Sequence, residues 1–362
     1  MNPVLPDDAV ELGQTARRAF TKLGGVDAAR RAEADPPSRH EIGGLLRELG
    51  IDDLDPRADA DTAAAAAVLC AEAGRVALPY PVAGVVLRGG TGGDGPGRPV
   101  AVVPGRRLRV DHGDLFDEWL VCGTDGSAVV ARPRGSRLAT RLGPFVTDLA
   151  VGPGNPDGRS TGTGEDRDPP AGHDPAAPSA PPPPSPSPSP SASPTAPAAS
   201  PRQAAWWLTL SSWTILGGLG RAVELATAHT QERIQFGKPL TAFQTVRFQL
   251  ADAAIAVAGL RELALFTLWR LDVAPDQAWP DVLALRSHAL DVARAVLRAS
   301  QQLHGASGLC DELDICVLVR HLQPALRLPA GAEETARQLA TAIAGHGFDG
   351  LFPHGTPAGR VA

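Results

Sequence analysis

The sequence has few aromatic residues, few cysteines and no long apolar run. Aromatic side chains make up 4% of the 362 residues, and alanine fills most apolar positions, which favours helices. The cysteines form no CxxC pair, and Cys310 and Cys316 lack further ligands at zinc-like spacing, so we predict no metal site. Reduced thiols in a cytosolic protein are the interpretation that we favour for all four cysteines: Cys70, Cys122, Cys310 and Cys316.

The sequence also has no excess of basic side chains. The 34 Lys and Arg are outnumbered by 40 Asp and Glu, which gives a net charge of −6 at pH 7. Nucleic-acid-binding proteins usually carry a basic face, so we expect no nucleic-acid partner. The first residues, MNPVLPDDAVELGQ, have no basic region followed by an apolar run, and predict no secretory signal. Charges interrupt every apolar segment, so we expect a cytoplasmic protein without a membrane partner.

Residues 1–88 have the pattern of a helical domain. Apolar residues recur at helical spacing over 7–23, and 40–51 and 61–77 are two further predicted helices. Asp61 is the expected N-terminal cap of the third. Residues 89–152 differ, because short β-branched runs alternate with Gly, Asp and Pro turns. They predict a reduced β domain of four or five strands, with a hairpin at GTDGS.

A proline- and serine-rich segment, 153–202, follows the predicted strands. It has almost no apolar side chains to offset the entropy of ordering, so we predict a disordered linker. A spacer is the favoured role, and binding to a proline-recognition domain is the alternative. Residues 203–348 then predict an antiparallel bundle, followed by a tail at 349–362. Its helices are expected from Gln203 onward and over 243–272, 281–305 and 333–345.

Three motifs in this chain resemble those of the acyl-CoA dehydrogenase family. QERIQFGKPLTAFQTVRFQLADAAI is similar to the family's R-x-x-F-G-x-x-[LI]-x-x-F-Q segment, QLHGASG to Q-x-x-G-G-x-G, and AEAGRVALPYP to E-x-G-R-x-x-x-P. The resemblance covers most of the chain outside 153–201. It implies an N-terminal helical domain, a reduced middle β domain and a C-terminal antiparallel four-helix bundle.

The resemblance also implies FAD, bound at a dimer interface. The arginine of the family's R-x-x-F-G turn reaches the pyrophosphate and adenine half of a partner subunit's FAD, and a guanidinium suits phosphate oxygens because it offers planar donors and stays charged. The implied FAD contacts are Arg233, Phe236, Gln244, Gln302, Gly305 and Gly308. The alternative is that Arg233 pairs with Glu232 or Glu224 and the glycines are helix caps.

Positions that would supply the family's catalytic base hold no acid. Matching the Y-E-G-T-like segment places Ala330 or Pro329 at the glutamate, and the other known position, on the first bundle helix, falls near Trp207. Glu333 and Glu334 are weak candidates for a relocated base, although they are better interpreted as charges of a helix N-terminus. No T-E-P-x-x-G-S-D-like loop or W-[IV]-[ST]-like element lies between Gly89 and Gly154, so the flavin-holding elements are also missing.

This pattern resembles the non-catalytic subunit of actinobacterial α2β2 acyl-CoA dehydrogenases of the steroid side-chain type. It implies α,β-dehydrogenation of a bulky acyl-CoA to the 2-enoyl-CoA, with FAD as hydride acceptor and the base supplied by a paralogous subunit. An electron-transfer flavoprotein is a further implied partner. Two alternatives stay open: a self-sufficient dehydrogenase that uses Glu333 or Glu334, and a flavin-free scaffold built on the same bundle.

Overall fold

The computed structural model describes residues 4–88, 98–103, 108–135, 142–151 and 201–346. The first of these ranges is helical, as the sequence predicts. Its elements are α1 (Asp7–Lys22), α2 (Val26–Ala34), η1 (Pro36–Ser38), α3 (Arg39–Glu48), η2 (Ile51–Asp53), α4 (Ala60–Arg75) and α5 (Val82–Val86). The cap of α4 is a correction: Asp59, not Asp61, accepts a hydrogen bond from the Thr62 backbone N–H, at 2.8 Å.

A five-stranded sheet follows the N-terminal helices. Its strands are β1 (Val100–Val102), β2 (Leu108–Asp111), β3 (Trp119–Cys122), β4 (Ala128–Pro133) and β5 (Val146–Val151), with η3 (Gly113–Leu115) after β2. The order is β1-β3-β4-β5-β2, and only the β1–β3 pair among these is parallel. The predicted hairpin joins β3 to β4, where Asp125 accepts hydrogen bonds from the N–H and hydroxyl of Ser127.

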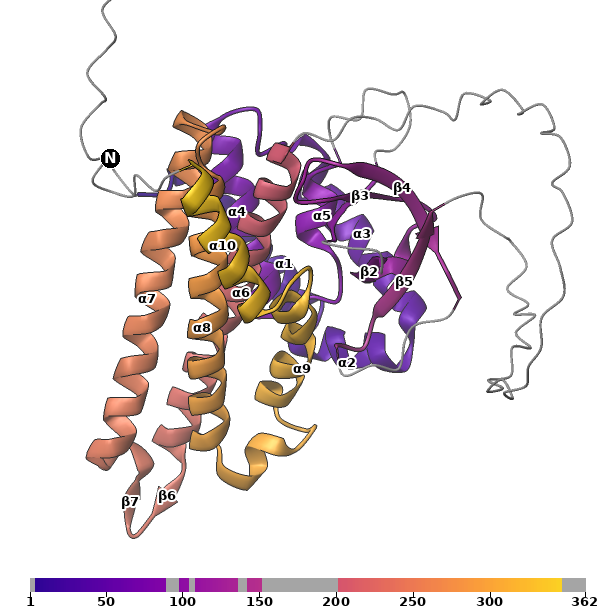
Figure 1. The fold of residues 1–362 in the computed structure, drawn as a ribbon. Helices are drawn as coiled ribbons and strands as arrows, with labels where there is room; N and C mark the ends of the chain where they lie inside the picture. Colours follow the sequence, from indigo (N-terminus) through magenta and orange to yellow (C-terminus); the bar gives the residue numbers. More distant parts are fainter. Residues whose placement is uncertain (1–3, 89–97, 104–107, 136–141, 152–200, 347–362) are drawn as a thin grey trace, which may run out of the picture.

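Long helices make up the C-terminal part. They are α6 (Pro201–Glu232), α7 (Gln244–Val273), α8 (Trp279–Leu303), α9 (Asp314–Arg327) and α10 (Ala332–His346). Short elements connect them: β6 (Ile234–Gln235), β7 (Lys238–Pro239), η4 (Leu240–Ala242) and η5 (Gly305–Leu309). Helix α8 packs against α6, α7 and α10 in the predicted bundle, whereas α9 lies beside α6 and α2 (Figure 1).

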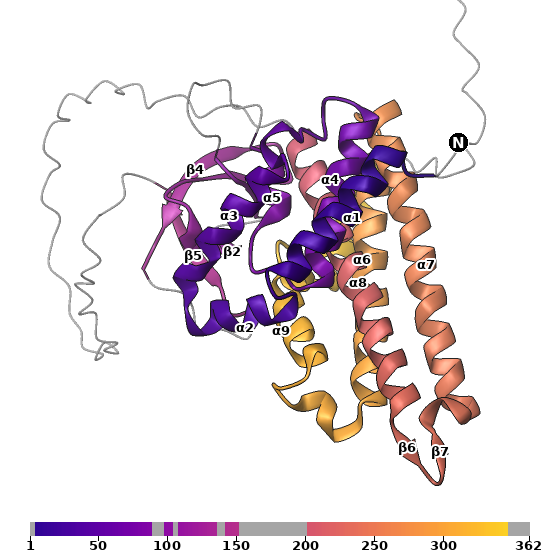
Figure 2. The same ribbon diagram turned by 180° about the vertical axis from the view of Figure 1, so that it is seen from behind.

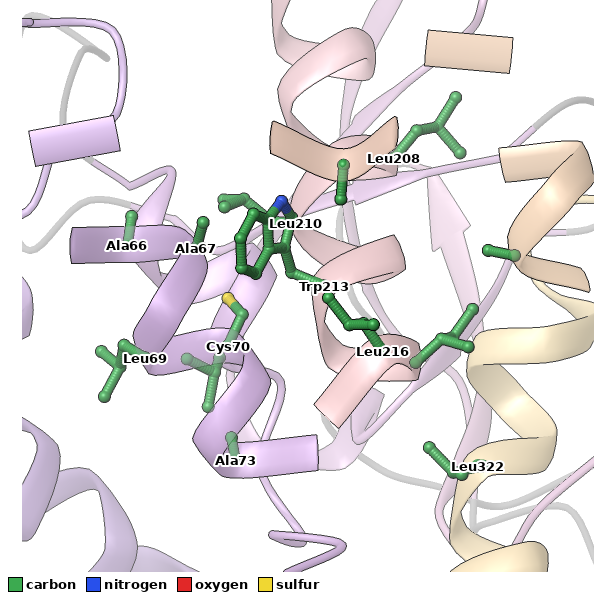
Figure 3. Packing of buried hydrophobic residues seen from close by; sticks show 14 of the residues in the cluster. Ala66, Ala67, Leu69, Cys70, Ala73, Leu208, Leu210, Trp213, Leu216 and Leu322 are labelled. Atoms are coloured by element: carbon green, nitrogen blue, oxygen red, sulfur yellow. The ribbon is translucent and has the colours of Figure 1, made fainter. Parts of the chain in front are cut away.

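Helix α6 joins the bundle to the N-terminal domain by packing along α4 (Figure 2). Trp213 of α6 is directed toward Cys70 and Ala67 of α4, and all three side chains are buried (Figure 3). The predicted fold class, mostly α with a small β domain, is therefore confirmed. The predicted linker at 153–202 and tail at 349–362 lie outside the described residues, apart from the two residues that begin α6. No described helix has both the length and the apolar character needed to cross a membrane.

Candidate functional site

The first candidate segment is a hairpin at one end of the bundle. Strands β6 and β7 pair Ile234 with Pro239 and Gln235 with Lys238, and the hairpin projects beyond α6 and α7 (Figure 1). Phe236 and Gly237 form its turn, with φ angles of 53° and 77°. The Phe236 side chain is 90% exposed, so this aromatic is available to a partner molecule rather than to the core of this chain.

Arg233 begins this hairpin, and its side chain is exposed. Its backbone N–H donates to the His229 carbonyl oxygen at 2.9 Å, which places it one turn beyond His229. Within the described part of the chain, neither Glu232 nor Glu224 pairs with the Arg233 guanidinium; Glu224 instead accepts from Arg75, at 2.7 Å. A guanidinium without a protein counter-ion is available to an anionic ligand.

The second candidate segment lies at the same end of the bundle, after α8 (Figure 1). Gln302 is exposed in the last turn of α8, and Gly305 has a φ of 64° with open space where a Cβ would stand. Gly308 is buried instead, and a Cβ there would lie only 2.4 Å from the Gln301 carbonyl oxygen. The structure thus leaves Gly305 open to a ligand, whereas Gly308 serves close packing of η5 on α8. Gln244 is exposed at the start of α7.

A stacked histidine pair joins the two segments, and the sequence analysis missed it. His229 of α6 and His304 of α8 have ring centroids 4.5 Å apart and planes inclined by 24°. His304 directly precedes Gly305, and Arg233 follows His229 by one helical turn. The pair therefore brings together the arginine and the open glycine that the motifs single out.

The candidate base positions hold no acid in the structure. Ala330 is buried and lies with Pro329 in the loop between α9 and α10. Glu333 and Glu334 belong to the first turn of α10, as the sequence favours. Arg337 donates to both Glu334 oxygens, at 2.8 and 2.5 Å, and holds the pKa of this exposed carboxyl below its ordinary value. Neither glutamate lines the cavity that the N-terminal helices, the sheet and the bundle enclose.

That cavity, of about 110 Å³, lies between α4, α5, β1, β2, α6 and α9. Trp207 and Leu328 line it, so both regions in which the resemblance would place a base border this space. Asp111 supplies the one carboxylate among its described lining residues. An engineered cavity of about 150 Å³ holds a single benzene, and drug-sized ligands need roughly 300 Å³ or more. The described cavity is therefore too small for a flavin ring and an acyl thioester together.

Burial shapes the charges on the cavity wall. It raises the pKa of Asp111 to about 7 and lowers that of His112 well below its ordinary value, an effect to which the nearby Arg39 adds. Arg39 can only donate, so His112 Nδ1, 3.3 Å from Arg39 Nη1, is the acceptor. The His112 Nε2–H then faces Asp111 Oδ2 at 3.4 Å. Sequence reasoning missed this chain of contacts because its members come from α3 and from the end of β2.

Comparison with known sequences assigns the bundle. The family model for the acyl-CoA dehydrogenase C-terminal domain matches residues 209–344. The acyl-CoA dehydrogenase IpdE2 of Mycolicibacterium smegmatis is 26% identical over 128 residues, which cover 35% of this chain and 39% of that relative. The chain thus matches less than half the length of the curated relatives.

Similar solved structures extend over nearly the whole chain. The ChsE4–ChsE5 complex from Mycobacterium tuberculosis has a TM-score of 0.67 at 17% identity, covering 95% of this chain and 99% of that one. A glutaryl-CoA dehydrogenase from Mycobacterium smegmatis in complex with FADH2 has a TM-score of 0.60 at 16% identity, covering 95% and 96%. The chain therefore has the acyl-CoA dehydrogenase fold, with an acyl-CoA dehydrogenase C-terminal domain at residues 209–344.

Proposed function

We propose that this chain is a subunit of an FAD-dependent acyl-CoA dehydrogenase complex. The complex oxidises a bulky acyl-CoA thioester to the 2-enoyl-CoA and passes electrons to an electron-transfer flavoprotein. Bound FAD supplies the hydride acceptor. The observation that carries the proposal is the end of the bundle, where the exposed Arg233 guanidinium and the open backbone at Gly305 lie on either side of one histidine stack.

The residues at this end fit the ADP half of the dinucleotide. Arg233 has no ion pair within the described residues and offers planar donors to two phosphate oxygens. Gln302 and Gln244 are exposed and provide amide groups for polar atoms of the nucleotide. At Gly305 no side chain blocks a close approach to the backbone. Phe236 adds exposed apolar cover beside the arginine.

The catalytic base and the wall around the flavin ring come from a paralogous subunit. Three observations support this division: neither Ala330 or Pro329 nor Trp207, where the resemblance would place a base, is an acid, Glu334 is bound to Arg337, and the described cavity is small. Exposed apolar side chains on α7, Phe248 at 58% and Ile255 at 69%, support burial against a second subunit in a dimer or an α2β2 tetramer.

Expression of the chain alone and together with an acyl-CoA dehydrogenase-like subunit encoded beside it tests the proposal. We expect the lone chain to lack flavin absorbance and dehydrogenase activity, and the co-purified complex to have both. Arg233→Ala in the complex is expected to release FAD, whereas Arg298→Ala, at another exposed arginine of the bundle, retains it. A lone chain that purifies yellow and active would contradict the assignment of the base to a partner.

The small cavity also favours a second candidate, a flavin-free scaffold that uses the bundle only for assembly. The same preparations separate the two functions. A complex that assembles but shows no flavin band after incubation with FAD would replace the first proposal by the second.

A further inference from the structure

We propose that His229 and His304 form, with Arg233, a diphosphate-binding group that takes up a proton when the dinucleotide binds. This inference rests on the proposed function and adds two residues to its FAD site. The motifs do not include either histidine as a ligand. Their placement between Arg233 and Gly305 is the reason to include them.

The geometry leaves one nitrogen of His304 for a ligand. The side chain is 8% exposed, and its Nδ1 lies 2.7 Å from the Ser300 carbonyl oxygen. A carbonyl oxygen only accepts, so Nδ1 carries the proton and Nε2 is the basic nitrogen of the neutral ring. No hydrogen bond joins Nε2 to another described residue. The half-buried His229 ring stacks on this imidazole, so an anion at either ring is near both.

Burial, together with two of its neighbours, favours the neutral form of His229 in the free chain. Its pKa is lowered by burial, then by His304 and Arg233, whereas Glu232 raises it. His304 is the titratable group that α8 presents to it, and Glu232 and Arg233 lie at the end of its own helix, α6. A diphosphate placed beside Arg233 reverses this balance, because nearby negative charge favours a protonated imidazole. Binding of the diphosphate and binding of a proton are then linked.

Calorimetric titration of ADP into the co-purified complex, after its FAD has been removed, tests the inference. Titrations at pH 7 in two buffers of different ionisation enthalpy give the number of protons taken up. We expect the wild type to take up part of a proton. His229→Gln should remove this uptake and weaken ADP binding about tenfold, the effect of losing one charge-assisted hydrogen bond. His304→Gln should act in the same direction.

Two further variants make the result specific. His229→Lys keeps a positive charge at neutral pH, so we expect it to restore ADP affinity without proton uptake. His288→Gln, at an exposed histidine elsewhere on α8, should behave as the wild type. Circular dichroism establishes that each variant is folded, and His229 is the more informative site because its ring is only half-buried.

The outcomes separate this inference from the proposed function. If His229→Gln and His304→Gln keep the wild-type affinity and proton uptake while Arg233→Ala abolishes ADP binding, the histidine inference is wrong and the FAD site stands. If Arg233→Ala leaves ADP binding unchanged, or the wild-type complex binds no ADP, both are wrong.

Discussion

The Nη2 atom of Arg286 lies 2.9 Å from the carbonyl oxygen of Leu328 and 3.5 Å from that of Ala330. This guanidinium is 1% exposed, and its Nε and Nη1 atoms have no hydrogen-bond partner in the described structure. Burial lowers the pKa of Arg286 to about 10. Helix α8 thus holds the loop between α9 and α10 by means of a buried cation that faces carbonyl oxygens.

Arg286→Met should be tolerated unusually well for a fully buried substitution. The variant loses the bond to Leu328, but it also removes a desolvated charge and two unsatisfied donors. We expect the free energy of unfolding to stay within about 1 kcal/mol of the wild type, measured by urea denaturation. Leu285→Ala, at a fully buried apolar neighbour, is the comparison and should cost about 2–5 kcal/mol. A loss above about 3 kcal/mol in Arg286→Met would show that the guanidinium is compensated by a bound anion or water.

The crossing of α4 and α6 depends on two glycines that face each other's helix. A Cβ on Gly74 would lie 1.9 Å from the Thr214 carbonyl oxygen, and one on Gly217 would lie 1.8 Å from that of Ala71. Gly74→Ala and Gly217→Ala should each destabilise the chain by about 1–3 kcal/mol, because the helices must separate. Gly220→Ala is the matched control in α6, where the nearest atom is 3.8 Å away, and it should gain up to about 1 kcal/mol of helix propensity. Equal melting temperatures for all three variants would contradict this packing.

Asp111 should make stability fall as pH rises from about 4 to 7. Its ordinary pKa of 3.8 is raised to about 7 in the fold, so in this window the native state holds a proton that the unfolded chain has released. Asp111→Asn cannot ionise, so we expect it to match the wild type near pH 4 and to be about 1–2 kcal/mol more stable at pH 8, since the side chain retains 29% exposure. Asp53→Asn, at an exposed site, should keep the wild-type slope. Denaturation curves at several pH values measure how the free energy of unfolding depends on pH. The same dependence in the wild type, Asp111→Asn and Asp53→Asn would contradict the raised pKa of Asp111.

Local signals explain which helices the sequence predicts. The predicted bundle helices have apolar residues at helical spacing, and the structure confirms them as α6, α7, α8 and α10. Helix α9 is missed because Pro324 lies inside it, and proline normally ends a helix. Helix α2 is missed because it is short and its buried face consists mostly of alanines, which give little periodic contrast.

The candidate site also contains residues that local sequence signals predict and contacts that only the structure shows. Arg233 and Gly305 are accessible to sequence reasoning because they belong to short motifs with a fixed spacing. The His229–His304 stack and the Arg39–His112 contact join helices or loops that are far apart in the chain, so no local sequence pattern predicts them. Gly308 belongs to a motif as well, yet its packing against Gln301 becomes visible only in the structure.

Assembly with a second subunit should depend on the outer face of α7. Phe248 and Ile255 are 58% and 69% exposed and stand two helical turns apart, so they form one apolar stripe that water would otherwise cover. Phe248→Glu combined with Ile255→Glu should prevent co-purification of the paralogous subunit, because an interface core excludes unpaired carboxylates. Neither side chain is part of the core of this chain, so circular dichroism and the melting temperature of the lone chain should change little. Val10→Glu, at a 40% exposed apolar position on α1, is the control and should leave assembly intact. Light scattering coupled to size exclusion measures the assembled mass, and a double variant that still forms the complex would place the subunit interface elsewhere.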